Sequence, residues 1–120
     1  VLSFPNMQTI RGVVQRGAGR GRTLGYATIN LPLEDSTISG IYVAQVYVGS
    51  EAPYTAAVFA DPKRGIIEAH VLDFQDELYG LGVTIELRKK IRDSKKFKND
   101  DELKTVIAED VAKVREYFKN

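Results

Sequence analysis

The sequence predicts a mainly-β protein: a small, closed or nearly closed antiparallel barrel of about six short strands, followed by one C-terminal α-helix packed on it. Segments rich in β-branched and aromatic residues recur along the first three quarters of the chain, separated by turns that contain glycine or proline. From residue 98 onward, the apolar period becomes that of a helix. At 120 residues the chain has the length of one domain, so we expect residues 1–120 to form a single domain.

The strands are expected in regular succession. Pro32 ends the second strand, and the third is the clearest because apolar residues occupy both of its faces. A turn is expected at residues 61–65, which read DPKRG. The six predicted strands are residues 8–15, 27–31, 41–48, 54–59, 66–72 and 83–88.

The C-terminal segment predicts one amphipathic helix. Asn99 followed by Glu102 is a plausible capping box, and Asp100 and Asp101 suit the positive end of the helix dipole. An apolar stripe at helical spacing comprises Leu103, Val106, Ile107, Val111, Val114 and Phe118.

The composition excludes several classes of protein. A formal charge of +1 argues against a general nucleic-acid binder. Cysteine is absent, which excludes disulfides, Cys-based zinc sites and thiol catalysis and fits a cytoplasmic location. No apolar run approaches the roughly 20 residues that span a bilayer, so we expect no membrane association.

Residues 12–31, GVVQRGAGRGRTLGYATINL, combine glycine with arginine. Gly17, Gly19 and Gly21 would let backbone amides approach an anion closely, and Arg20 would add charge. The alternative is a flexible surface loop with solvated arginines. The segment fits neither a P-loop nor a dinucleotide fingerprint, since no G-x-x-x-x-G-K-[ST] is present and a strand is expected where a helix should follow.

Thr28 and Asn30 lie two residues apart in the second strand, so both side chains point to one side and could face a hard cation or a phosphate. Glu68 lies within an apolar strand, where a carboxylate is costly unless it is paired, hydrated or functional. Its alternative is a barrel-edge position facing water or an arginine. His70, the single histidine, is expected to be a satisfied structural side chain.

Three motifs, in order, resemble those of riboflavin kinases. GRGRTLGYATINL is similar to the signature G-x-G-R-G-R-x-L-G-x-P-T-A-N, with Ala27 in place of proline and Ile29 in place of alanine. Residues 68–74, EAHVLDF, followed by LYG at 78–80, match the family's E-x-H-x-L-D-F and L-Y-G. IRDSKKF at 91–97 is similar to the loop L-R-x-x-x-K-F, within a run at 88–98 that carries seven basic residues and one acid. A solvated loop is the alternative for that run.

The resemblance implies a six-stranded Greek-key barrel that transfers the γ-phosphate of ATP to the terminal ribityl hydroxyl of riboflavin, giving FMN and ADP with Mg²⁺. It also implies roles for particular residues. Glu68 would be the catalytic base, and Arg92 and Phe97 would contact the flavin. ATP and its phosphates would be bound by Gly17, Gly19, Arg20, Gly21, Thr28 and Asn30, the last two also holding the metal.

The resemblance extends to the kinase module of bacterial bifunctional FAD synthetases, which also carry an adenylyltransferase domain. We do not expect that domain within these residues, nor FMN adenylylation. Two alternative functions remain open. The departures at Ala27 and Ile29 would suit a degenerate module that binds flavin or nucleotide without turnover. The second alternative is a small barrel that binds nucleic acid through residues 16–22 and 88–98. The sequence lacks a dense aromatic platform for stacking bases.

Overall fold

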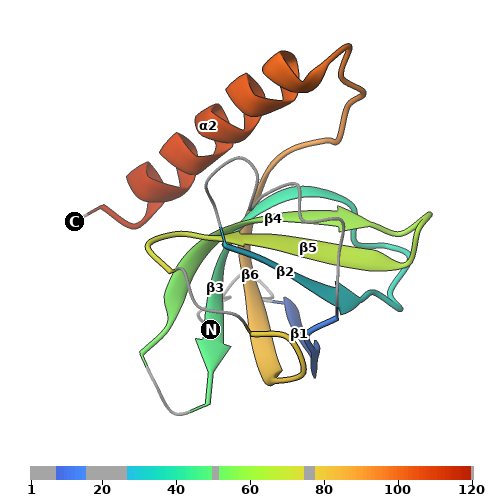
Figure 1. Ribbon diagram of the computed structural model, residues 1–120, viewed down its shortest axis with the longest axis vertical. Coiled ribbons are helices and arrows are strands. Elements are labelled where there is room, and N and C mark those ends of the chain that lie inside the picture. The colour runs from blue at the N-terminus through green and yellow to red at the C-terminus, as the bar shows by residue number, and fades with distance from the viewer. Residues whose placement is uncertain (1–7, 16–26, 50–51, 75–77, 120) are drawn as a thin grey trace, which may run out of the picture.

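The computed structural model describes residues 8–15, 27–49, 52–74 and 78–119, which form one strongly curved sheet and one helix (Figure 1). The helix is α2 (Asp100–Tyr117). The strands are β1 (Gln8–Val13), β2 (Ala27–Pro32), β3 (Gly40–Val48), β4 (Tyr54–Asp61), β5 (Ile66–Val71) and β6 (Gly82–Arg92). In this part of the chain no helix is long and apolar enough to cross a membrane.

The sheet confirms the Greek-key barrel. Its strand order is β1-β6-β3-β4-β5-β2, and all of its pairs are antiparallel. Strands β3, β4 and β5 follow one another in the sheet while β6 returns to lie beside β3, which is the Greek-key arrangement. The end strands approach each other, and the amide of Gln15 donates to the carbonyl of Asn30 at 2.8 Å. The barrel is therefore nearly closed.

Alternation along the strands places one set of side chains inside the barrel. Leu31, Val46, Val58, Ile67 and Ile85 have no exposed surface and form the centre of this core. Ile29, which replaces the alanine of the family motif, packs in the same core with 2% of its surface exposed. Side chains alternate between the two faces of a strand, so the residues that lie between these core positions on β2 and β5 face outward.

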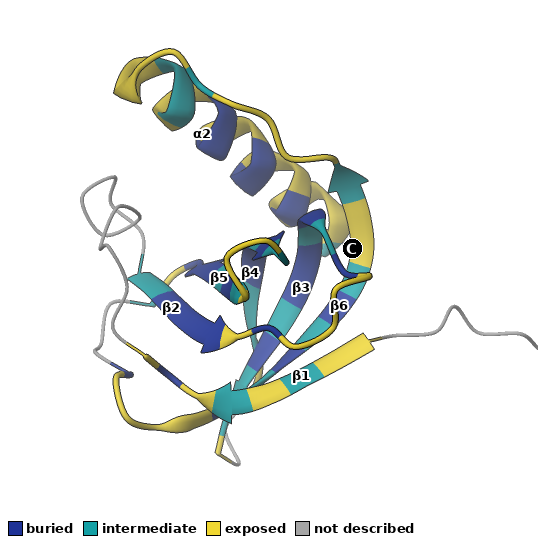
Figure 2. Cartoon of the chain, turned by 90° about the vertical axis from the view of Figure 1, so that its right-hand side faces the viewer, coloured by how far each residue is buried: buried dark blue, intermediate teal, exposed yellow. Residues whose placement is uncertain are grey.

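Helix α2 covers part of the outer face of the sheet. Figure 2 shows its buried residues turned toward the strands. Val111 and Val114 pack against Val43 of β3 and Ala57 of β4 in a second apolar cluster. The predicted cap is present, because the Asn99 side chain accepts a hydrogen bond from the Glu102 amide at 2.9 Å.

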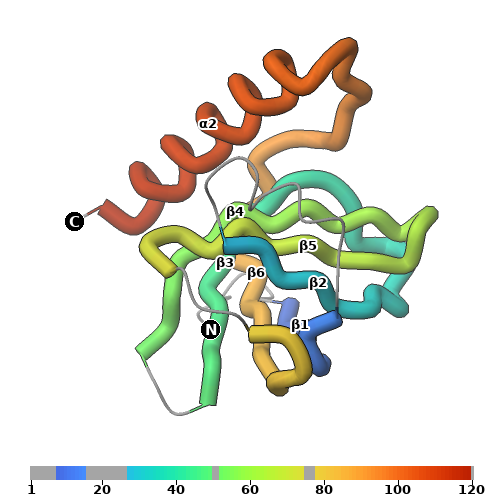
Figure 3. Tube along the Cα trace, in the orientation of Figure 1, coloured from blue at the N-terminus to red at the C-terminus, as the bar shows by residue number. Residues whose placement is uncertain are grey.

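The sixth strand is longer than predicted. Residues 89–92, expected in a loop, continue β6 and pair with β3 through two register shifts. Ile91 explains this, because it packs into the cluster beneath α2. Gly40 lies beside the end of the strand with φ +100°, and a Cβ there would lie 2.7 Å from the carbonyl oxygen of Arg92. Beyond Arg92 the chain rises to the start of α2, which then returns across the barrel (Figure 3).

The other strand boundaries differ from the predicted ones by a few residues. Strand β1 ends at Val13, and Gln15 contributes only an isolated bridge. Strand β4 extends to Asp61, because Ala60 still packs inside the barrel with 1% exposure. The predicted turn at 61–65 is confirmed, and Gly65 adopts φ +66° there.

Candidate active site

Four polar side chains meet on the outward side of β2 and β5. Thr28 pairs with His70, and Asn30 pairs with Glu68, in direct cross-strand register. The carbonyl of Asn30 points away from β5, toward the amide of Gln15. Both pairs are therefore of the non-hydrogen-bonded kind, in which facing side chains lie closest together. The register thus gathers a hydroxyl, an amide, a carboxylate and an imidazole into one patch.

Among the described residues, the charged partner of Glu68 is His70 and not an arginine. The Nε2 atom of His70 lies 3.4 Å from Oε1 of Glu68, and its Nδ1 atom lies 3.5 Å from Oγ1 of Thr28. Strand β5 lies between β4 and β2, so Glu68 is not on an edge strand. Burial lowers the pKa of His70 below its ordinary value, and the negative charges of Glu68 and Asp110 oppose that effect. His70 is a buried, satisfied side chain, as predicted.

Asn30 carries a buried atom that lacks a partner. Its Oδ1 accepts no hydrogen bond from the described residues, although only 3% of the residue is exposed. A buried polar atom in that condition destabilises the fold unless a ligand completes it. The described residues contain no group of three His, Cys, Asp or Glu side chains that would hold a metal by themselves. An amide oxygen beside a hydroxyl suits Mg²⁺, which needs few protein ligands when phosphates and water supply the rest.

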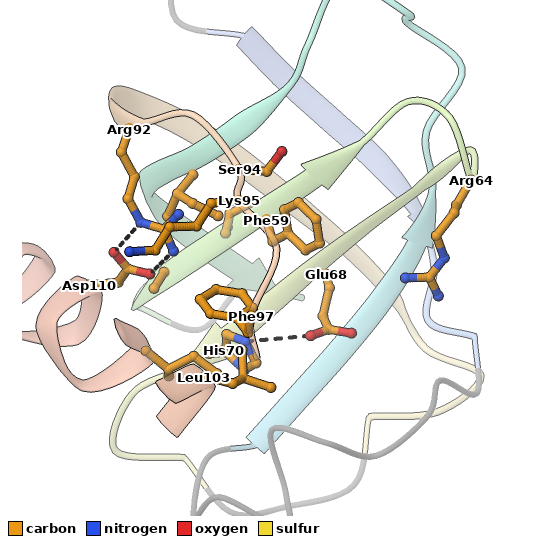
Figure 4. A pocket seen from close by; sticks show the side chains of 14 residues that line it. Phe59, Arg64, Glu68, His70, Arg92, Ser94, Lys95, Phe97, Leu103 and Asp110 are labelled. Atoms are coloured by element: carbon orange, nitrogen blue, oxygen red, sulfur yellow. Dashed lines mark hydrogen bonds and ion pairs between the residues drawn. The ribbon is translucent and has the colours of Figure 1, made fainter. Parts of the chain in front are cut away.

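A cavity of about 270 Å³ adjoins Glu68 and His70 on the side of β4. That volume lies at the small end of ligand pockets, which measure roughly 300–1,000 Å³. Figure 4 shows Phe59, Phe97 and Glu68 among the side chains that line it. The lining comes from the sheet, the segment after β6 and α2: Ile41, Ala57, Val58, Phe59, Arg64, Glu68, His70, Arg92, Ser94, Lys95, Phe97, Leu103, Ile107 and Asp110. It is a largely apolar pocket with several charged groups in its lining.

Arg92 lines this cavity, but its guanidinium is occupied by the protein. Nε donates to Oδ1 of Asp110 at 2.9 Å and Nη2 to Oδ2 at 2.7 Å, while Nη1 donates to the carbonyl of Asp93 at 2.9 Å. Asp110 is 4% exposed and lies on the buried face of α2. The pair ties the end of β6 to the helix, and both of its residues line the pocket.

The structure brings together most of the predicted site residues. Thr28, Asn30 and Glu68 lie in one patch, and Arg92 and Phe97 line the adjoining cavity. The predicted phosphate-binding residues Gly17, Gly19, Arg20 and Gly21 lie outside the described residues.

Sequence reasoning missed three pocket residues, Phe59, Arg64 and Asp110. Asp110 carried a usable signal: it follows Val106 by four residues and Ile107 by three, so it falls on the apolar stripe of the helix. A carboxylate on that stripe requires a partner. Phe59 lies directly opposite Glu68 on β4, a relation that appears only once the register is known.

A Greek-key barrel that places a carboxylate between an apolar pocket and a hydroxyl–amide pair defines the class: a small β-barrel domain with a candidate small-molecule site and no P-loop motif in its sequence. The chain belongs to the riboflavin kinase family. The family model described as "Flavokinase: Riboflavin kinase" matches residues 5–118.

Individual proteins agree with this assignment. The chain is 38% identical to the bifunctional riboflavin kinase/FMN adenylyltransferase of Escherichia coli over 117 residues, covering 91% of this chain and 37% of that protein. It therefore spans little more than a third of the length of that relative. The riboflavin kinase of Trypanosoma brucei shares the fold, with a TM-score of 0.66 at 22% identity, over 95% of this chain and 82% of the other.

A further solved structure carries a different name. It is described as a macrolide-efflux protein from Streptococcus pneumoniae, and it matches with a TM-score of 0.74 at 33% identity. The match covers 89% of this chain and 38% of that protein.

Proposed function

We propose that this domain transfers the γ-phosphate of ATP to the terminal ribityl hydroxyl of riboflavin, giving FMN and ADP. The observation that carries the proposal is the position of Glu68. Its strand lies between β4, which forms one wall of the apolar pocket, and β2, which carries Thr28 and Asn30. A base in that position lies where an acceptor hydroxyl from the pocket would meet a phosphate held beside β2, which is the arrangement that in-line phosphoryl transfer uses.

The pocket supplies the acceptor side. Phe59 and Phe97 in its lining would give a flat heteroaromatic ring stacked or edge-to-face contact. The volume of about 270 Å³ suits the ring system rather than a whole flavin with its chain. The polar ribityl chain would then extend out of the pocket toward Glu68. Arg92 would act on the flavin site chiefly through its hold on Asp110.

The chemical step is an in-line displacement. The Glu68 carboxylate accepts the proton of the ribityl hydroxyl as the hydroxyl oxygen forms a bond to the γ-phosphorus. The bond between that phosphorus and the oxygen bridging it to the β-phosphate breaks, and ADP leaves with the electron pair. A positioned general base of this kind contributes roughly 10²–10⁴-fold in rate.

Thr28 and Asn30 would hold Mg²⁺ on the phosphate side. The buried, unpartnered Oδ1 of Asn30 and the adjacent hydroxyl of Thr28 are oxygen donors of the type that Mg²⁺ prefers. When bound, the ion neutralises charge on the phosphates during transfer. Gly17, Gly19, Arg20 and Gly21, which precede β2 in the chain, remain the residues that we expect to contact the phosphates.

Turnover is favoured over a binding-only module. The larger side chain of Ile29 is accommodated in the barrel interior, with 2% of its surface exposed, and leaves the outward-facing Thr28 and Asn30 in register with β5. Ala27 also packs against that core, half-buried at the start of β2. Neither departure from the family motif removes a polar group of the candidate site.

Nucleic-acid binding is the weaker alternative because much of the basic run is already engaged. Arg88 pairs with Glu86, Lys90 with Asp93, and Arg92 with Asp110. We expect no nucleic-acid or membrane partner and a cytoplasmic location. FMN adenylylation, which is named for the relatives, is not proposed for these 120 residues.

The test is a direct assay of FMN formation from riboflavin and ATP, run with Mg²⁺ and with chelator. We expect FMN and ADP in equal amounts, dependent on Mg²⁺. Binding of riboflavin and of ATP without any product would instead identify a binding module. Salt-sensitive binding of RNA without binding of either small molecule would identify the nucleic-acid alternative.

A further inference from the structure

The ring of His70 lies between Glu68 of β5 and Thr28 of β2. It is the single histidine of the chain and only 7% exposed. One ring nitrogen faces Oε1 of Glu68 at 3.4 Å and the other faces the hydroxyl of Thr28 at 3.5 Å (Figure 4 shows the contact with Glu68). Both distances are at the long end for hydrogen bonds, as is common in sites without bound substrate. One ring thus contacts both the proposed base and a proposed metal ligand.

The chemistry of the neighbours selects one tautomer. A neutral imidazole has one N–H donor and one acceptor nitrogen. A carboxylate only accepts, so the nitrogen beside Glu68, Nε2, must carry the hydrogen. Nδ1 then has a lone pair and accepts the hydroxyl proton of Thr28. The reverse tautomer would place a lone pair against the carboxylate.

We propose that His70 is a positioning residue, which through its Nε2–H tautomer orients the Thr28 hydroxyl and the Glu68 carboxylate together. The inference rests on the proposed function. With its proton turned to the imidazole, Thr28 directs its oxygen lone pairs away from the ring, as a cation ligand must. With Oε1 held by His70, Glu68 keeps its second oxygen for the substrate hydroxyl.

The tautomer can be measured directly, without activity. Because the chain has one histidine, ¹⁵N-labelled protein gives one pair of ring-nitrogen signals that need no assignment. We expect a protonated Nε2 and an unprotonated Nδ1 at neutral pH. A protonated Nδ1, or an even mixture of the two tautomers, overturns the proposal.

Two substitutions separate the two contacts. In His70→Asn the side-chain oxygen occupies the place of Nδ1, so the Thr28 contact is kept and the Glu68 contact is lost. In His70→Gln the amide nitrogen reaches the place of Nε2, so the Glu68 contact is kept and the Thr28 contact is lost. We expect His70→Asn to lower kcat and to leave the Kd for Mg-ATP close to that of the parent, and His70→Gln to raise that Kd and to lower kcat less. Removing a partner that orients a ligand typically changes affinity or activity about 10–100-fold.

His70→Phe is the matched control, because it fills the space of the ring without either polar contact. It should show both defects, and calorimetric binding of ATP should lose most of its dependence on Mg²⁺. If the three variants lower only the melting temperature and retain kcat and Kd, His70 is structural and the proposal is wrong. If the parent forms no FMN, the proposed function fails. The tautomer and the Mg²⁺ dependence of ATP binding then still decide the role of His70.

Discussion

Asn30 and Glu68 lie directly opposite each other on β2 and β5, in a pair whose backbones do not hydrogen-bond to one another. Their side chains therefore extend side by side from the sheet, the amide next to the carboxylate. This relationship places a proposed metal ligand beside the proposed base, as a reaction between a metal-bound phosphate and a hydroxyl demands. The pairing depends on the register between β2 and β5. A slip of one residue in either strand would turn its side chain, Asn30 or Glu68, into the barrel core.

Asn30→Leu should separate stability from function. The substitution removes the buried, unpartnered Oδ1, so the free energy of unfolding without ligand should rise by about 1 kcal/mol. Binding of ATP should at the same time lose its dependence on Mg²⁺. Chemical unfolding and calorimetry measure the two quantities.

Asn30→Asp is the control for that experiment, because it keeps the oxygen and adds a charge next to Glu68. It should bind Mg-ATP and be less stable without the metal. A less stable Asn30→Leu protein that binds Mg-ATP like the parent would show that Asn30 is a structural residue.

Asp110→Asn should loosen the pocket through Arg92. The neutral amide cannot reproduce the two charged contacts, so stability should fall by about 2 kcal/mol, less than for a fully buried pair because the Arg92 side chain is 20% exposed. The KM for riboflavin should rise while the Kd for Mg-ATP stays unchanged. Arg115→Gln breaks another ion pair of α2, an exposed one with Asp73, and should change neither the melting temperature nor KM appreciably. Equal effects of the two substitutions would refute a special role for the Arg92–Asp110 pair.

Phe97→Leu should weaken flavin binding. The aromatic contact with the isoalloxazine ring is expected to contribute about 0.5–1.5 kcal/mol beyond apolar burial, so the KM for riboflavin should rise roughly 2- to 12-fold with little change in kcat. Phe118→Leu provides the comparison, since Phe118 packs beneath the end of α2 and does not line the cavity. An unchanged KM for riboflavin in Phe97→Leu would remove Phe97 from the flavin site.

Much of the fold could be predicted from the sequence, because each element carries its own local signal. Strict alternation in residues 66–72 predicted that Glu68 and His70 share a face, and Ile67, Ala69 and Val71 do point inward. The cap at Asn99 was equally local. The length of β6 was not predictable in this way, since Lys89 and Lys90 read as a solvated loop. Only Ile91, packed beneath a helix that comes later in the chain, accounts for their place in a strand.

The candidate site residues could be named from the sequence, but their spatial relationships could not. The motifs pointed to Thr28, Asn30 and Glu68, but the register that pairs them is a long-range property of two strands separated by 33 residues between Pro32 and Ile66. The same holds for Arg92, which was expected to contact flavin and is engaged by Asp110 on α2. Contacts between distant segments depend on the whole packing, and no local pattern encodes them.

The most direct test of Glu68 as the general base is the turnover of Glu68→Gln, measured together with its melting temperature. The amide retains the shape and the strand pairing of Glu68 and removes its capacity to accept the hydroxyl proton. We expect FMN formation to fall by roughly 10²–10⁴-fold, with riboflavin and Mg-ATP binding nearly unchanged.

Glu86→Gln is the matched control for this measurement. It neutralises a half-buried carboxylate on β6 that pairs with Arg88 and does not line the cavity, and it should leave turnover intact. If Glu68→Gln lowers only the melting temperature, and the folded protein forms FMN at the parent rate, Glu68 is not the base and the account is wrong.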